Sequence, residues 1–169
     1  GYVGLVSGAC FADFGHSVTC IDKDPAKIAA LEAGRMPIYE PGLEALVNGN
    51  AAAGRLSFTT DLPAGIADAN AIFIAVGTPS RRGDGHADLS YVYAAAAEIA
   101  ENLTRPAVIV TKSTVPVGTG DEVERIMREA NSATQISVVS NPEFLREGAA
   151  IGDFKRPDRI VIGAEDEQA

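Results

Sequence analysis

The sequence predicts a doubly wound α/β fold, in which a parallel sheet carries helices on both faces. Short β-branched apolar runs alternate along the chain with segments of helical periodicity. The runs are almost wholly apolar, which is typical of strands that are buried on both faces. Strands that alternate with helices form right-handed βαβ units, and such units place the strands side by side in a parallel sheet.

Five apolar runs are expected to form strands, and three segments between them have the spacing of amphipathic helices. The expected strands are residues 18–21, 71–76, 107–110, 136–139 and 159–162. The helical stripes are Val3, Val6, Cys10 and Phe14, then Val92, Ala96, Ile99 and Leu103, and then Val123, Ile126, Met127 and Ala130. Asp24 followed by Pro25 is typical of a helix start, and Gly15 and Gly34 stand where helix ends are expected.

Length, charge and cysteine content limit the class of protein. The 169 residues suit a single domain over residues 1–169. The formal net charge of −9 disfavours nucleic acid and anionic membranes as partners, and no apolar run approaches the ~18 residues of a membrane-spanning helix. Cys10 and Cys20 form no disulfide framework and are expected to be inert core thiols, which favours a cytoplasmic location. No cluster of side chains has the ligand spacing of a metal site.

A glycine turn at the start of the chain indicates a dinucleotide site. Gly1 and Gly4 open the first helical stripe, where free backbone N–H groups favour a pyrophosphate. Asp22 ends the next expected strand, at the spacing of roughly 20 residues at which an acidic residue binds the adenosine ribose. A carboxylate there favours NAD over NADP because it repels a ribose phosphate. The alternative is a helix start with glycines for close packing and a solvated Asp22.

The glycine pattern is incomplete at its front. Such a turn normally has an earlier glycine and a strand before it, and neither stands before Gly1. We therefore expect a Rossmann-like fold whose first, central strand is missing from this sequence. The chain is expected to be a fragment that also lacks residues at its back, and to be poorly stable alone.

Polar loops follow three of the expected strands, at residues 76–80, 112–119 and 140–148. Because the carboxyl ends of parallel strands meet at one edge of a sheet, we expect these loops on the same edge as Gly1 and Gly4. Hydroxyls and backbone amides there can hold a nucleotide. Glu143 and Glu147 would share a face if their segment is helical, and one could act as a general base. The alternative is a Glu143 that caps a turn and a Glu147 on the surface.

Five segments together resemble the UDP-glucose/GDP-mannose dehydrogenase family. They are residues 1–5 (GYVGL), 39–43 (YEPGL), 77–79 (Gly-Thr-Pro), 112–119 (KSTVPVGT) and 141–148 (NPEFLREG). The similarity spans essentially the whole chain in order, its last two motifs are the most specific, and it is closest to the bacterial members that act on UDP-glucose.

The resemblance implies a two-step, NAD-dependent oxidation of the C6 alcohol of UDP-glucose to UDP-glucuronate, with two NAD reduced. The implied cofactor-binding residues are Gly1, Tyr2, Val3, Gly4, Asp22, Lys27, Val76, Gly77, Thr78, Pro79, Ser80, Ser113, Thr114, Val115 and Glu147. The implied substrate-binding residues are Glu143, Phe144, Leu145, Arg146 and Glu147. Glu143 matches the family's acid/base carboxylate, and Thr114 matches the hydroxyl that helps to place a catalytic water.

The chain departs from the family pattern in its catalytic cysteine and lysine. The family's nucleophile lies in a Cys-Phe-Pro-Lys-Asp-type motif after a catalytic lysine, and this sequence contains neither. We therefore expect the chain alone, without the central helix and the UDP-binding domain, not to produce UDP-glucuronate. A homodimer is expected for the full-length protein. A dehydrogenase for GDP-mannose or a UDP-N-acetylhexosamine, and a non-catalytic NAD-binding module, are the alternatives.

Overall fold

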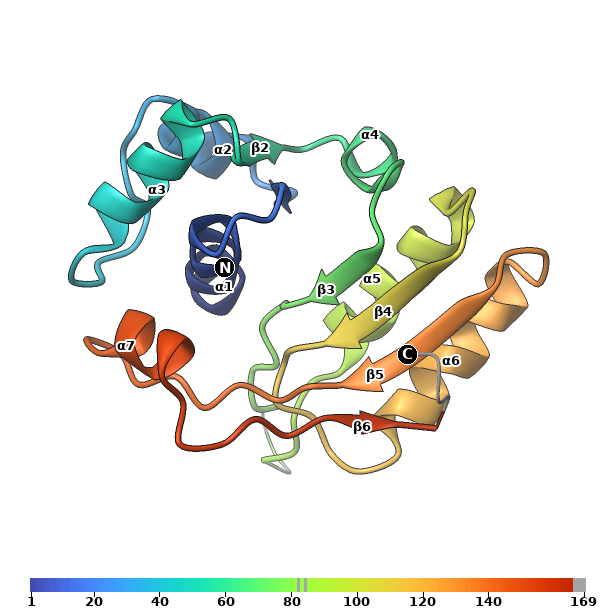
Figure 1. Cartoon of the computed structure of the whole chain (residues 1–169). Helices are drawn as coiled ribbons and strands as arrows, with labels where there is room; N and C mark the ends of the chain where they lie inside the picture. The colour runs from blue at the N-terminus through green and yellow to red at the C-terminus, as the bar shows by residue number, and fades with distance from the viewer. Residues whose placement is uncertain (82, 84, 166–169) are drawn as a thin grey trace. The chain divides into compact units, whose positions relative to one another are not determined.

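The computed structural model describes residues 1–81, 83 and 85–165, and its chain divides into two compact units (Figure 1). The first unit comprises Gly1–Gly65 and Phe144–Arg159. The second comprises Ile66–Glu143 and the residues from Ile160 on. Positions 82, 84 and 166–169 lie outside the described residues.

The first unit is built around a parallel pair of strands. Its elements in chain order are α1 (Tyr2–Asp13), β1 (Val18–Ile21), α2 (Pro25–Glu32), α3 (Leu43–Ala52), β2 (Leu56–Thr59) and α7 (Ala150–Lys155), with α4 (Leu62–Ile66) at the boundary. Val18 pairs with Leu56, and Ile21 with Thr59. The strand β2 was not predicted, because its sequence, Leu-Ser-Phe-Thr, alternates apolar and polar residues and so forms no apolar run.

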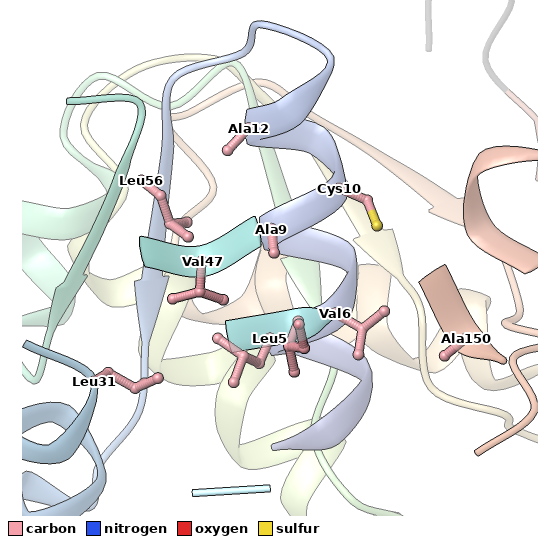
Figure 2. Packing of buried hydrophobic residues seen from close by; sticks show 10 residues of the cluster. Leu5, Val6, Ala9, Cys10, Ala12, Leu31, Val47, Leu56 and Ala150 are labelled. Atoms are coloured by element: carbon pink, nitrogen blue, oxygen red, sulfur yellow. The ribbon is translucent and has the colours of Figure 1, made fainter. Parts of the chain in front are cut away.

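Helix α1 supplies half of the core residues of the first unit. Val6, Ala9 and Cys10 are fully buried, and side chains from α2, α3, β2 and α7 pack around them (Figure 2). The members of this core are Leu5, Val6, Ala9, Cys10, Ala12, Leu31, Leu43, Val47, Leu56 and Ala150. The predicted stripe is correct at Val6 and Cys10 and wrong at Phe14, the C-cap residue of α1, which is 54% exposed.

The predicted helix boundaries of the first unit are confirmed. The Asp24 side chain accepts hydrogen bonds from the N–H groups of Ala26 and Lys27, and Pro25 is the first residue of α2. Gly15 and Gly34 have φ values of +99° and +72°, the left-handed conformation that ends a helix and that glycine adopts without strain.

The second unit is a four-stranded sheet with two helices on one face (Figure 1). Its elements are β3 (Ala71–Ile74), α5 (Ser90–Asn102), β4 (Ala107–Thr111), α6 (Thr119–Ala130), β5 (Ile136–Ser140) and β6 (Gly163–Ala164). The strands lie in the order β3-β4-β5-β6, the first three parallel and β6 antiparallel to β5. The predicted stripes of α5 and α6 are buried at Val92, Ala96, Ile99, Leu103, Val123 and Met127.

The predicted α/β class with parallel strands is confirmed, with two corrections to its strands. Residues 159–162 are not a strand: Ile160 and Ile162 are 69% and 66% exposed, and the ladder forms instead at Gly163–Ala164. Burial on both faces holds for β4 but not for β3, in which Ile72 and Ile74 are buried while Ala71 and Phe73 are exposed. An almost wholly apolar run therefore does not by itself establish that both faces are covered.

In the part of the chain that the structure describes, every helix is too short or too polar to cross a lipid bilayer.

Candidate functional site

The start of α1 and the end of β1 lie together in the first unit. Gly1 is the N-cap of α1, so the N–H groups of the first turn are free of helical partners. The nitrogen of Gly1 lies 3.2 Å from Oδ2 of Asp22, the residue that follows β1. The Lys27 ammonium lies 3.7 Å from the same oxygen. Three of the predicted cofactor-binding residues, Gly1, Asp22 and Lys27, are thus neighbours.

Asp22 is held as a carboxylate. Partial burial favours the neutral acid, but the hydrogen bond from the Asp24 N–H, the nearby nitrogen of Gly1 and the positive charge of Lys27 outweigh it, so the pKa of Asp22 lies below its ordinary value. A cavity of about 150 Å³ adjoins it and is lined by Gly1, Leu5, Asp22, Lys27, Leu31, Pro37 and Ile38. A mostly apolar cavity, an ionised carboxylate and a helix N-terminus are the kinds of group that bind the base, the ribose and the phosphate of an adenine nucleotide.

In the second unit, hydrogen bonds tie together the loops after β3 and β4. The Ser113 hydroxyl donates to the carbonyl oxygen of Val76 at 2.7 Å. The Thr78 hydroxyl donates to the carbonyl oxygen of Thr114 at 3.2 Å. Ser113 is buried and Thr114 is exposed. The structure therefore brings Val76, Thr78, Ser113 and Thr114 together at one end of the sheet, as the parallel order of their strands predicts.

The loop after β5 joins the same end of this sheet through a buried lysine. Lys112, which follows β4, donates from its ammonium to the side-chain oxygen of Asn141 at 3.0 Å. Asn141 in turn donates to the carbonyl oxygen of Val161. Burial lowers the pKa of Lys112, and the nearby carboxylate of Glu143 partly opposes this. A cation thus stands beside the carboxylate predicted to be the acid/base group.

The segment that contains Glu143 and Glu147 is not helical. Residues 141–146 have no regular secondary structure, residues 147–149 form a turn, and α7 begins only at Ala150. The shared helix face that was considered for the two glutamates therefore does not exist. Pro142 disfavours helical geometry at Asn141, and Gly148 has a φ of +87°, so the sequence itself interrupts a helix here.

Ionic contacts fix this segment within the first unit. Asp153 on α7 accepts from the backbone N–H of Arg146 at 2.9 Å and from its guanidinium at 2.6 Å. These bonds to Arg146 lower the pKa of Asp153 to about 2. The guanidinium carbon of Arg159 lies 5.4 Å from the centre of the Phe144 ring, a cation–π contact.

Glu40 lies in the motif of residues 39–43, but the sequence assigned it no role in the site. Its carboxylate, only 5% exposed, accepts from the Tyr2 hydroxyl at 2.6 Å and from the N–H groups of Gly148 and Ala150 at 2.8 and 2.9 Å. Burial alone would raise its pKa, but these three donors together lower it. A lone glutamate before Pro41-Gly42 gives no sequence signal that it will be buried.

Both cysteines behave as core thiols. Cys10 is buried and Cys20 half-buried, and both are free. Burial raises the pKa of each to about 11, so neither forms a thiolate near neutral pH. Among the described residues, no three His, Cys, Asp or Glu side chains are placed to hold a metal ion.

Comparison with known proteins gives close relatives over almost all of this chain. The UDP-glucose 6-dehydrogenase of Rhizobium meliloti is 72% identical over 98% of the chain, and that of Pseudomonas aeruginosa is 50% identical over 100% of it. The chain spans 38% of the length of each of these curated relatives.

Solved structures agree with this relationship. The UDP-glucose dehydrogenase of Pyrobaculum islandicum has a TM-score of 0.95 at 48% identity, and the GDP-mannose dehydrogenase of Pseudomonas aeruginosa, in a ternary complex, has 0.95 at 38%. Each match covers 99% of this chain and 40% of the other. The family model described as the NAD binding domain of the UDP-glucose/GDP-mannose dehydrogenase family matches residues 1–169. The chain therefore belongs to the UDP-glucose/GDP-mannose dehydrogenase family, and it corresponds to the NAD-binding domain of that family.

Proposed function

We propose that the protein is an NAD-dependent UDP-glucose 6-dehydrogenase and that this chain is its NAD-binding domain. The observation that carries the proposal is the ionised Asp22 beside an apolar cavity and the free N–H groups of α1, an arrangement suited to an adenine dinucleotide. The identity to relatives named UDP-glucose 6-dehydrogenase supports the choice of substrate.

Both units contain residues that are proposed to bind the cofactor or the substrate. In the first unit, Gly1, Tyr2, Val3 and Gly4 bind the pyrophosphate, Asp22 and Lys27 bind the adenosine ribose, and residues 144–147 contact the nucleotide sugar. In the second unit, residues 76–80 and 113–115 line the cofactor. Glu143 is the acid/base carboxylate, and Thr114 helps to place the catalytic water.

The reaction requires two hydride transfers. Conversion of the C6 alcohol to a carboxylate removes four electrons, and NAD, when bound, accepts two of them at a time. In the first step the hydroxyl proton passes to Glu143, directly or through water, as the C6 hydride leaves. By resemblance to the family, a cysteine that this sequence does not contain adds to the aldehyde, and the adduct loses the second hydride to give a thioester. Hydrolysis of that thioester releases the carboxylate and the thiol, and it needs a water held by Thr114 and activated by a base.

The proposal is tested with the full-length protein and a panel of nucleotide sugars. We expect UDP-glucose to give two NADH per molecule oxidised, measured by NADH absorbance and by chromatography of the product. Turnover of GDP-mannose or a UDP-N-acetylhexosamine in preference to UDP-glucose would instead assign one of those substrates. Binding of NAD without turnover of any nucleotide sugar would favour a non-catalytic module.

The proposal extends to the state of the full-length protein. By similarity to the family it is a homodimer in the cytoplasm that binds neither nucleic acid nor membranes, and the net charge of −9 supports the last two points. Sedimentation velocity measures the oligomeric state.

A further inference from the structure

We propose that Glu40 is a positioning residue that fixes two parts of the proposed site at once: Tyr2 at the start of α1, and the backbone that follows Glu147. The inference rests on the proposed function, because it assigns Glu40 a role in binding the NAD and UDP-sugar of that reaction. All of the groups concerned belong to the first unit.

The Glu40 carboxylate joins three segments that are distant in sequence. Oε2 accepts from the Tyr2 hydroxyl at 2.6 Å and from the Gly148 N–H at 2.8 Å, and Oε1 accepts from the Ala150 N–H at 2.9 Å. The carboxylate is 5% exposed, so water does not readily replace these donors. Hydrogen bonds to an ionised acceptor are roughly twice as strong as those between neutral groups.

The bond to Gly148 acts directly on Glu147. The N–H of Gly148 belongs to the same planar peptide as the carbonyl group of Glu147, so fixing one fixes the other. Gly148 also has a φ of +87°, which directs the chain from the exposed Glu147 into α7. The bond to Ala150 caps the start of α7, where a helix leaves its N–H groups unpaired.

The Tyr2 hydroxyl donates to the same Glu40 oxygen that accepts from Gly148. Tyr2 is the first residue of α1, and its ring packs against the core of the first unit. Anchoring the hydroxyl fixes the side chain beside the free N–H groups of the first turn. One carboxylate therefore orders a residue proposed to bind NAD and the segment proposed to contact the UDP-sugar.

The test is Glu40→Gln in the full-length protein, because glutamine keeps the size of the side chain but only one of its two acceptor oxygens. Its NH₂ group replaces one oxygen and faces a backbone N–H, so at least one of Gly148 and Ala150 loses its bond. We expect the KM values for both NAD and UDP-glucose to rise about tenfold, with a smaller change in kcat. Tyr2→Phe removes only one donor and should raise the KM for NAD alone.

Two measurements separate positioning from general stability. The NAD dissociation constant, measured by calorimetry, should rise in Glu40→Gln, and amide hydrogen exchange should accelerate in peptides that cover Gly148 and Ala150. Glu44→Gln, an exposed glutamate four positions on, is the matched control and should behave as wild type. If Glu40→Gln does not fold, as judged by circular dichroism, Glu40→Asp keeps the charge, shortens the reach, and should raise both KM values.

The outcomes distinguish this inference from the proposed function. If wild-type protein oxidises UDP-glucose and a folded Glu40 variant keeps both KM values and the NAD dissociation constant, the inference is wrong and the function stands. If wild type oxidises no nucleotide sugar, the function is wrong, and NAD affinity with hydrogen exchange still decides the role of Glu40.

Discussion

At the scale of residues, we expect the charge of Asp22 to favour NAD over NADP. In Asp22→Asn we expect the affinity for NAD to fall about tenfold, because two hydrogen bonds from the ribose lose a charged acceptor. The loss for NADP should be smaller, because removing the carboxylate also removes its repulsion of the ribose phosphate. Calorimetric titration with NAD and with NADP measures the dissociation constant of each nucleotide for wild type and variant. Asp68→Asn, at a fully exposed side chain of the second unit, is the control. Wild-type protein that binds NADP as tightly as NAD would contradict the assignment.

Asn141 links a buried cation to the backbone of the second unit. Asn141→Ala removes both the acceptor for the Lys112 ammonium and the donor to Val161, so we expect the free energy of unfolding to fall by about 1.5–3 kcal/mol. Urea denaturation measures the loss. Asn48→Ala, at an exposed side chain with one long hydrogen bond, should change stability by less than about 0.5 kcal/mol. Equal effects of the two substitutions would show that the Lys112 contact contributes little.

At the scale of elements, the packing of α1 on β1 depends on a glycine. A Cβ atom at Gly8 would lie 2.6 Å from Sγ of Cys20, closer than atoms in contact can approach. We expect Gly8→Ala to lower the free energy of unfolding by roughly 1–3 kcal/mol through overpacking, measured by urea denaturation. Cys20→Ala should restore part of this loss in the double variant, since it removes the sulfur.

The control for Gly8 is another glycine inside a helix. A Cβ at Gly49 of α3 would meet nothing within 4 Å. Gly49→Ala should therefore raise the free energy of unfolding by about 0.5–1 kcal/mol, because alanine loses less conformational freedom in a helix. Destabilisation of the same size at both positions would mean that contact with Cys20 is not the cause.

For the whole molecule, stability in acid should depend on Asp153. Its pKa is lowered to about 2 in the folded chain by Arg146, against about 3.9 for a free aspartate. A depressed folded pKa contributes stability that is complete above the unfolded value and is lost as the pH falls through the folded value. The difference in unfolding free energy between wild type and Asp153→Asn should thus be constant above about pH 5 and shrink as the pH falls towards 2.

Urea denaturation at several pH values measures this difference. Glu124→Gln, at a surface glutamate of α6 that pairs with Arg128, is the control variant in the same urea denaturation series. A gap between wild type and Asp153→Asn that widens as the pH falls would contradict the sign of the effect.

The prediction from sequence succeeded where local chemistry decides the structure. Asp24 with Pro25 fixed the start of α2, and the stripe of α5 is buried as its spacing requires. It failed at residues 159–162, because an apolar run reports hydrophobicity and not whether a neighbouring strand is available to pair. It also missed β2, whose pairing with β1 depends on residues far away in the chain.

The amino-acid order alone determined the class of fold, the glycine turn, Asp22 and the family motifs, because each depends on residues that are close in sequence. Only the tertiary structure decided that Glu40 is buried and bonded to Tyr2, Gly148 and Ala150, and that Lys112 stands beside Glu143. Those contacts join segments up to 110 positions apart. Long-range burial and hydrogen bonding arise from packing, which no local pattern of residues encodes.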